Sequence, residues 1–143
     1  MHRLFFDINI LLDVIQERKP HFQSAQRLLS QVAAGSLAGA TPGFCSATTC
    51  VTLYYLVAKG TNHKTAIDVI RQILRTLSVV EINRKILERG LELDMKDYED
   101  GVQVACAEFC KADYIITGNI KDFKNSPIRC LSASEYLALM SRA

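Results

Sequence analysis

The sequence lacks the features that define several large classes of protein. Its 143 residues contain no uninterrupted apolar run of roughly 18 residues, the length that a membrane-spanning helix requires. No basic segment with a long apolar core precedes the first predicted strand, so we expect no secretory signal and a cytoplasmic protein. Internal repeats, low-complexity tracts and linkers are also absent. These absences indicate a single domain over residues 1–143 that has no membrane partner.

Cysteine and histidine do not occur in metal-binding motifs. The five cysteines are an odd number, no CxxC pair occurs, and no histidine lies at zinc-ligand spacing from any of them. A disulfide framework and a zinc site are therefore not expected. Cys106 and Cys110 lie one helical turn apart in an apolar pattern, which is typical of two core thiols.

The net charge is small, and one long segment contains no acidic residue. The formal net charge is +2 at pH 7, which is too small to predict nucleic-acid binding from electrostatics alone. No Asp or Glu occurs between Glu17 and Asp68. The helix that we predict from about residue 46 to residue 58 therefore has no carboxylate to contribute to an acidic site.

Short apolar runs alternate with helical patterns along the chain. We predict strands near residues 3–7, 40–45, 77–82, 113–117 and 128–131. The segments between most of these runs carry apolar residues at helical spacing. Strands that alternate with helices favour an α/β fold in which helices cover a central parallel sheet.

The segment of residues 97–123, DYEDGVQVACAEFCKADYIITGNIKDF, contains most of the candidate site. It begins with Asp97, Glu99 and Asp100, which we place in the first turn of a helix, where acids complement the helix dipole and Asp97 suits the N-cap. Helical spacing predicts one buried face, formed by Tyr98, Val102, Ala105, Cys106 and Phe109. Taken singly, each acid is also explained as an ordinary residue of a helix start.

A buried strand with a polar end follows this helix. Tyr114–Ile116 is a short apolar run, typical of a parallel strand. It leads directly to Thr117 and Asn119, and Asp122 comes three residues later. Ligands of open parallel sheets bind beyond the carboxyl ends of the strands. These polar residues are therefore candidates for a binding site.

Asp7 is the strongest single candidate for function. It ends the apolar run of residues 3–7, and Asn9 follows it. A carboxylate in apolar surroundings requires a partner or a metal ion, because burying an isolated charge is costly. The alternative is that Asp7 only caps the helix that follows.

The candidate carboxylates converge in the predicted topology. Asp7 and the 117–122 segment both lie at the carboxyl edge of the sheet, beside the start of the acidic helix. Carboxylates gathered in this way repel one another unless a positive charge lies between them. Hard cations with oxygen ligands are the natural occupants of such a site.

Two segments of the sequence resemble the motifs of a known family. The opening LFFDINILLDVI resembles the N-terminal motif of PIN domains, and EDGVQVACAEFCKADYIITGNIKDF resembles their C-terminal half. The resemblance covers essentially the whole chain. It implies a PIN-like, three-layer α/β/α sandwich with a central parallel sheet.

The resemblance also implies an activity and partners. PIN domains are typically endoribonucleases that bind Mg²⁺ or Mn²⁺, and they include VapC-type toxins of bacterial toxin–antitoxin pairs. We therefore expect cleavage of RNA, a cognate antitoxin protein and a homodimer. In this interpretation the catalytic residues are Asp7, Asp100 and Asp122. The implied metal ligands are Asp7, Asp100, Asn119 and Asp122. Auxiliary residues near the same site are Asn9, Thr52, Asp97, Glu99 and Thr117.

The chain departs from the family pattern at two positions. The family acid on the helix after the second strand corresponds to Thr52 or a close neighbour, and Gly118 occupies the place of a frequent arginine. The departures leave open a catalytically weakened PIN-like module that binds RNA or protein. A third hypothesis, a haloacid-dehalogenase-like enzyme with Asp7 as nucleophile, requires an acid at the position of Asn9 and a cap for which the chain has no room.

Overall fold

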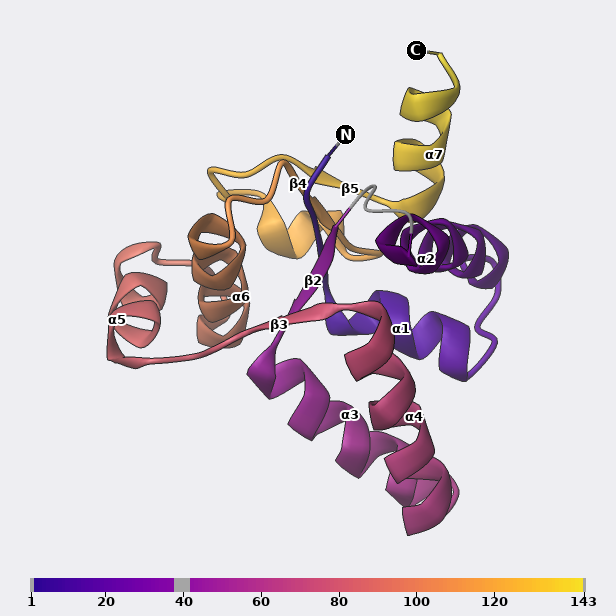
Figure 1. The fold of residues 1–143 in the computed structure, drawn as a ribbon. Coiled ribbons are helices and arrows are strands. Elements are labelled where there is room, and N and C mark those ends of the chain that lie inside the picture. Colours follow the sequence, from indigo (N-terminus) through magenta and orange to yellow (C-terminus); the bar gives the residue numbers. More distant parts are fainter. Residues whose placement is uncertain (1, 38–41, 143) are drawn as a thin grey trace.

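Five parallel strands form one sheet in the computed structural model, which describes residues 2–37 and 42–142 (Figure 1). The strands are β1 (Leu4–Phe6), β2 (Gly43–Ser46), β3 (Ser78–Val80), β4 (Tyr114–Ile116) and β5 (Cys130–Leu131). Their order across the sheet is β3-β2-β1-β4-β5, and every neighbouring pair is parallel. The predicted parallel sheet is therefore confirmed. Residues 40 and 41 of the predicted 40–45 strand lie outside the described residues.

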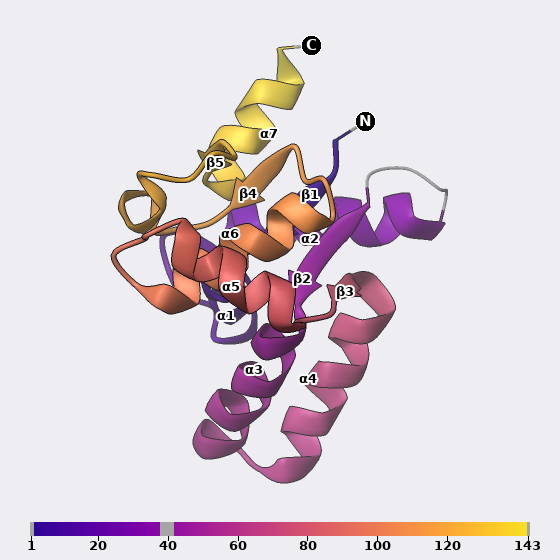
Figure 2. The ribbon, with the colours of Figure 1, turned by 90° about the vertical axis from the view of Figure 1, so that its left-hand side faces the viewer.

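Helices cover both faces of this sheet. They are α1 (Ile8–Ile15), α2 (Phe22–Leu37), α3 (Ala47–Gly60), α4 (His63–Thr76), α5 (Arg84–Glu92), α6 (Tyr98–Phe109) and α7 (Ala133–Ser141), with a 3₁₀ helix η1 (Ile120–Phe123). Helices α5 and α6 lie on one face and α1, α2 and α7 on the other, while the α3–α4 pair extends beyond the sheet (Figures 1 and 2). The arrangement is the predicted three-layer α/β/α sandwich. Within the described ranges, no helix is long and apolar enough to cross a membrane.

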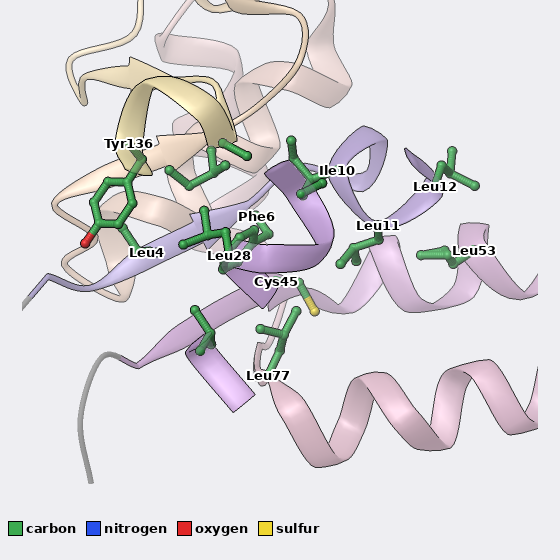
Figure 3. Close-up of a cluster of buried hydrophobic side chains, with 14 of the residues drawn as sticks. Leu4, Phe6, Ile10, Leu11, Leu12, Leu28, Cys45, Leu53, Leu77 and Tyr136 are labelled. Atoms are coloured by element: carbon green, nitrogen blue, oxygen red, sulfur yellow. The ribbon is translucent and has the colours of Figure 1, made fainter. Parts of the chain in front are cut away.

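The central strand β1 contributes to two hydrophobic cores. Its three residues are fully buried, and successive side chains of a strand point to opposite faces. Leu4 and Phe6 join the core beneath α1, α2 and α7, which Figure 3 shows, and Phe5 joins the core beneath α5 and α6. Burying a side chain of this size contributes about 1.5–3 kcal/mol. The two cores fix β1 in the middle of the sheet.

The carboxyl ends of β1 and β4 are level with each other. Phe6 is paired with Ile116, and the Asp7 amide donates a hydrogen bond to the Ile116 carbonyl at 3.0 Å. On the other side of β4, the Thr117 amide donates to the carbonyl of Leu131 at 3.0 Å. Asp7 and Thr117 therefore lie next to each other at one edge of the sheet.

The predicted buried face of α6 is partly wrong. Tyr98 and Phe109 are 45% and 66% exposed, whereas the middle of the helix is buried on all sides. The reason is that α6 lies between the sheet and α5, so two layers enclose its centre while its ends project. Cys106 and Cys110 are buried, as predicted for core thiols. The buried residues of the helix are Gly101, Val102, Gln103, Val104, Ala105, Cys106 and Ala107.

Helices α5 and α6 touch backbone to backbone at two glycines. A Cβ atom on Gly101 would lie 2.7 Å from the carbonyl oxygen of Gly90. A side chain at this position would force the helices apart. This close approach holds the first turn of α6, which carries Asp100, against helix α5.

Candidate active site

Asp7 is a buried carboxylate held by two side-chain donors. It is 4% exposed and follows β1 directly. The Thr117 hydroxyl donates to Asp7 Oδ2 at 2.9 Å, and the Asn9 amide Nδ2 donates to the same oxygen at 3.1 Å. Asp7 occupies the N-cap position of α1, but its side chain makes no capping hydrogen bond. Its carboxylate is therefore held by Thr117 and Asn9, and a role of Asp7 beyond the N-cap of α1 stays a prediction.

The surroundings of Asp7 shift the pKa of its carboxyl in two opposite directions. Burial is the largest effect and raises the pKa of the Asp7 carboxyl. The hydrogen bonds from Thr117 and Asn9 lower this pKa, as does the nearby Ile8 amide, while the charge of Asp122 raises it. The donors thus stabilise a carboxylate whose burial and acidic neighbour favour protonation.

Asp100 lies in the first turn of α6 and is partly buried. Burial, followed by the charges of Asp97, Asp7, Asp122 and Glu99, raises the pKa of Asp100 to about 7. The charges of Asp7 and Asp122 thus contribute to the raised pKa of Asp100, after burial and the charge of Asp97. We call the site formed by Asp7, Asp100 and Asp122 the acidic pocket.

The other acids of the first turn of α6 are exposed. Asp97 is the N-cap and accepts a hydrogen bond from the Glu99 amide at 2.9 Å, as predicted from the sequence. Its carboxylate is thereby engaged in capping. Together with Glu99, it raises the pKa of Asp100 from the rim of the acidic pocket.

The segment after β4 is linked to Asp7 by hydrogen bonds. Thr117 is fully buried, and its hydroxyl accepts a hydrogen bond from the Asn119 amide at 3.0 Å while donating to Asp7. Asp122 follows in η1, and both it and Asn119 are exposed. Thr117 therefore links the end of β1 to the loop that carries Asn119 and Asp122.

Thr52, to which the family resemblance assigns an expected acid, lies on α3. Thr52 is half-buried and stands one helical turn beyond the fully buried Thr49. Ser46, the last residue of β2, caps this helix by accepting a hydrogen bond from the Thr49 amide at 3.2 Å. The first two turns of α3 therefore present hydroxyl groups where a carboxylate was expected from the family pattern.

Two buried polar residues were missed by sequence reasoning. Asp13 on α1 is 5% exposed and forms an ion pair with Arg18 at 3.9 Å. Gln103 on α6 is 2% exposed and donates a hydrogen bond from Nε2 to the Thr49 hydroxyl at 3.5 Å. Both interrupt apolar helical patterns, and this interruption was the signal that could have identified them.

The donor set fits a hard divalent cation that keeps part of its water shell. In residues 2–37 and 42–142, no group of three or more Asp, Glu, His and Cys side chains is arranged to hold a metal ion. The acidic pocket nevertheless offers only oxygen ligands, and the neighbouring negative charges add to the effect of burial in raising the pKa of Asp100. A cation bound at this site would reduce the repulsion between the carboxylates. It would do so although the three carboxylates do not form a closed cage around it.

The pKa of Asp100, raised first by burial and then by the neighbouring negative charges, predicts a pH-dependent stability. Asp100→Asn is expected to stabilise the metal-free protein by about 1–2 kcal/mol at pH 8, a figure reduced for solvent screening. Because the pKa of Asp100 rises from 3.8 to about 7 on folding, its stabilising contribution is complete below the unfolded value and is lost as the pH rises through 7. Urea unfolding at pH 4 and pH 8 measures the difference, with the exposed Asp68→Asn as control. Equal stabilities of wild type and Asp100→Asn at pH 8 would contradict it.

The structure defines a class: a parallel α/β sandwich with carboxylates gathered at the carboxyl edge of its sheet. The sequence profile of the PIN domain matches residues 3–121, and the chain belongs to the PIN domain family. It is 26% identical over 141 residues to Ribonuclease VapC1 of Aquifex aeolicus (strain VF5), across 94% of this chain and 92% of that protein. The predicted family is therefore confirmed.

Solved structures share the fold. VapBC2 from Rickettsia felis, bound to a DNA fragment from its promoter, aligns with a TM-score of 0.70 and 20% identity over 90% of this chain and 97% of that chain. A toxin–antitoxin complex from Klebsiella pneumoniae aligns with a TM-score of 0.66 and 24% identity over 91% of this chain and 97% of that chain. At these identities the likeness establishes the fold.

Proposed function

We propose that this chain is a divalent-metal-dependent endoribonuclease that cleaves RNA phosphodiesters and acts as the toxin of a toxin–antitoxin pair. The observation that carries the proposal is the buried Asp7 carboxylate, held by Thr117 and Asn9 within range of the charge of Asp122. Membership of the PIN family and the similarity to a protein named a ribonuclease support the same activity.

The residues of the pocket have distinct parts in this mechanism. Asp7, Asp100 and Asp122, with the neutral amide oxygen of Asn119, would hold Mg²⁺ or Mn²⁺. When bound, the cation neutralises the phosphodiester and lowers the pKa of an attacking water. Thr117 and Asn9 orient Asp7 through its Oδ2 atom. Burial of the Asp7 and Thr117 side chains keeps this part of the site dry, which strengthens its electrostatic interactions.

The composition of the pocket limits its metal affinity. Asp7, Asp100 and Asp122 supply about three negative charges, sufficient for one divalent cation that keeps some of its waters. A second cation would require the carboxylate that is absent at Thr52. Gly118 offers no side chain to contact phosphate. We therefore propose one weakly held ion.

Protein partners are the second part of the proposal. Large apolar side chains are exposed on the α3–α4 pair, among them Val51, Tyr55 and Leu74, which are 59%, 67% and 55% exposed. The solved relatives described above are toxin–antitoxin complexes. We propose that this chain forms a homodimer and binds an antitoxin, one segment of which covers the acidic pocket.

A catalytically weakened RNA- or protein-binding module is the second candidate function. Two observations favour it: Thr52 stands in place of an acid, and the described residues contain no three-carboxylate metal cluster. This module would keep the fold and the partner surfaces but would not cleave RNA.

Cleavage of a fluorescent single-stranded RNA library distinguishes the two candidates. Wild-type protein with Mn²⁺ is expected to cut the library, and excess EDTA is expected to abolish the cut, because the carboxylates alone cannot neutralise the phosphate. Thr52→Glu is expected to raise the rate about tenfold by restoring a ligand near the pocket. A silent wild type alongside an active Thr52→Glu protein would favour the binding module. Cleavage that persists in EDTA would contradict a metal-dependent mechanism.

A further inference from the structure

Cys45 and Cys50 form a pair of thiols in contact. Cys45 lies in β2, and Cys50 is the fourth residue of α3, the helix that follows this strand directly. Their Sγ atoms are 3.9 Å apart, close enough for one thiol to donate a hydrogen bond to the other. Both thiols are free in this structure. The sulfur atoms of a disulfide are about 2 Å apart, so the pair needs to approach by about 2 Å to form one.

The two thiols differ in their exposure to solvent. Cys45 is fully buried in the hydrophobic core that Figure 3 shows. Cys50 packs against the same core but remains partly exposed. A dissolved oxidant therefore meets Cys50 first, and the reaction partner available to Cys45 is the sulfur of Cys50 beside it.

The hydrogen bond between the thiols favours the thiolate form of Cys50. It is the largest effect on both groups: it lowers the pKa of Cys50 to about 7 and raises the pKa of Cys45, which burial raises further. Burial opposes ionisation of Cys50, while its own backbone amide favours it, as does the positive end of the α3 dipole. Cys50 is thus the nucleophile of the pair, and Cys45 keeps its proton and donates it to the hydrogen bond.

The other three thiols lack this combination. Burial raises the pKa of the Cys106, Cys110 and Cys130 thiols, and a protonated thiol is a poor nucleophile. Two of them also donate to backbone carbonyls: the Cys110 thiol to that of Ala107 and the Cys130 thiol to that of Ile128. The five cysteines therefore divide into one reactive pair and three thiols that stay protonated.

We propose that Cys45 and Cys50 are a redox modification site, in which a hydroperoxide oxidises the pair to a reversible disulfide that ties β2 to α3. The Cys50 thiolate attacks the hydroperoxide, the O–O bond breaks, and Cys50 becomes a sulfenic acid while the alcohol leaves with the proton that Cys50 had released. The Cys45 sulfur then attacks the Cys50 sulfur, the S–O bond breaks, and the departing hydroxide takes the Cys45 proton to form water. Two electrons pass from the thiols to the peroxide. A dithiol reductant reverses the reaction by thiol–disulfide exchange.

The bridge spans the start of α3. Ser46, which lies between the two cysteines, caps this helix with its side chain. The disulfide therefore fixes the first turn of α3 to the carboxyl end of β2. The proposal does not depend on the proposed nuclease activity.

Limited oxidation of the full-length chain tests this proposal. Reduced protein is treated with an equimolar amount of hydrogen peroxide, blocked with N-ethylmaleimide and digested with trypsin, which releases residues 28–59 by cleavage after Arg27 and Lys59. Mass spectrometry is expected to find that this fragment has lost two hydrogen atoms and takes up maleimide only after treatment with dithiothreitol. Before oxidation, Cys50 is expected to react with iodoacetamide at least about tenfold faster than the buried Cys106.

Cys45→Ser separates the two steps of the reaction. Serine keeps a hydroxyl donor beside Cys50 but has no sulfur to close the bridge, so Cys50 is expected to stop at the sulfenic acid, which dimedone traps. Cys50→Ser should leave Cys45 reduced, and the matched control Cys106→Ser should form the bridge as the wild type does.

The wild-type protein alone decides the outcome if a variant does not fold. The proposal is overturned if its 28–59 fragment keeps two free thiols after oxidation. It is also overturned if these thiols end as sulfinic acids or as bridges to another cysteine, or if Cys50 and Cys106 are alkylated at equal rates.

Discussion

Asp100→Asn is expected to slow RNA cleavage by at least about a hundredfold while the protein remains folded. The substitution removes a charge that the proposed cation needs. It also removes the cost of burial and the repulsion by neighbouring acids, which together raise the pKa of Asp100 to about 7. Loss of activity and gain of metal-free stability should therefore occur in the same protein. Initial rates on the fluorescent RNA library with Mn²⁺ measure the first effect.

Asp7→Asn is the companion variant. The same loss of cleavage is expected, because its carboxylate is the most buried acid of the pocket and accepts the hydrogen bonds of Thr117 and Asn9. Asp68→Asn on α4, an exposed acid away from the pocket, should cut at the wild-type rate. Full activity of both Asp7→Asn and Asp100→Asn would mean that the cleavage arises at another site.

Gly101→Ala is expected to destabilise the protein by about 3 kcal/mol, at the upper end of overpacking. The added Cβ would lie 2.7 Å from the backbone carbonyl oxygen of Gly90, and a backbone atom cannot rotate away as a flexible side chain can. Helices α5 and α6 would have to separate. Urea unfolding in metal-free buffer measures the loss, and the displaced first turn of α6 should also reduce Mn²⁺ binding by Asp100.

Gly60→Ala provides the control for this effect. Gly60 ends α3, and a Cβ atom there would have no other atom within 4 Å. Alanine at this helical position is expected to keep or raise the stability by about 0.5 kcal/mol. Equal stabilities of Gly101→Ala and Gly60→Ala would show that α5 and α6 accommodate the extra atom easily, contrary to their close approach.

The fold could be predicted from the sequence because its strands are short, apolar and separated by helices. Runs such as Leu4–Phe6 and Tyr114–Ile116 are buried on both sides, and only a covered parallel sheet buries them in this way. The same rule brings Asp7 and Thr117 to one edge of the sheet. The catalytic role of the pocket stays a prediction, because geometry alone does not establish chemistry.

The sequence alone could not predict which helices contact one another. Periodicity predicts a single buried face for α6. Helix α5 covers the other side of the centre of α6, so Gln103 is buried. Phe109 is exposed because it lies at the projecting end of the helix. The two-sided burial depends on glycines that meet from different helices.

The strand order has a consequence for the life of the nascent chain. Strand β1 is synthesised before its neighbour β4, and Asp7 and its partner Thr117 are 110 residues apart. A growing chain that has not yet released β4 holds an unsupported Asp7 and lacks η1 with Asp122. The proposed acidic pocket is therefore complete only after β4 and η1 have been synthesised, so the proposed cleavage of RNA can begin only after that stage of translation.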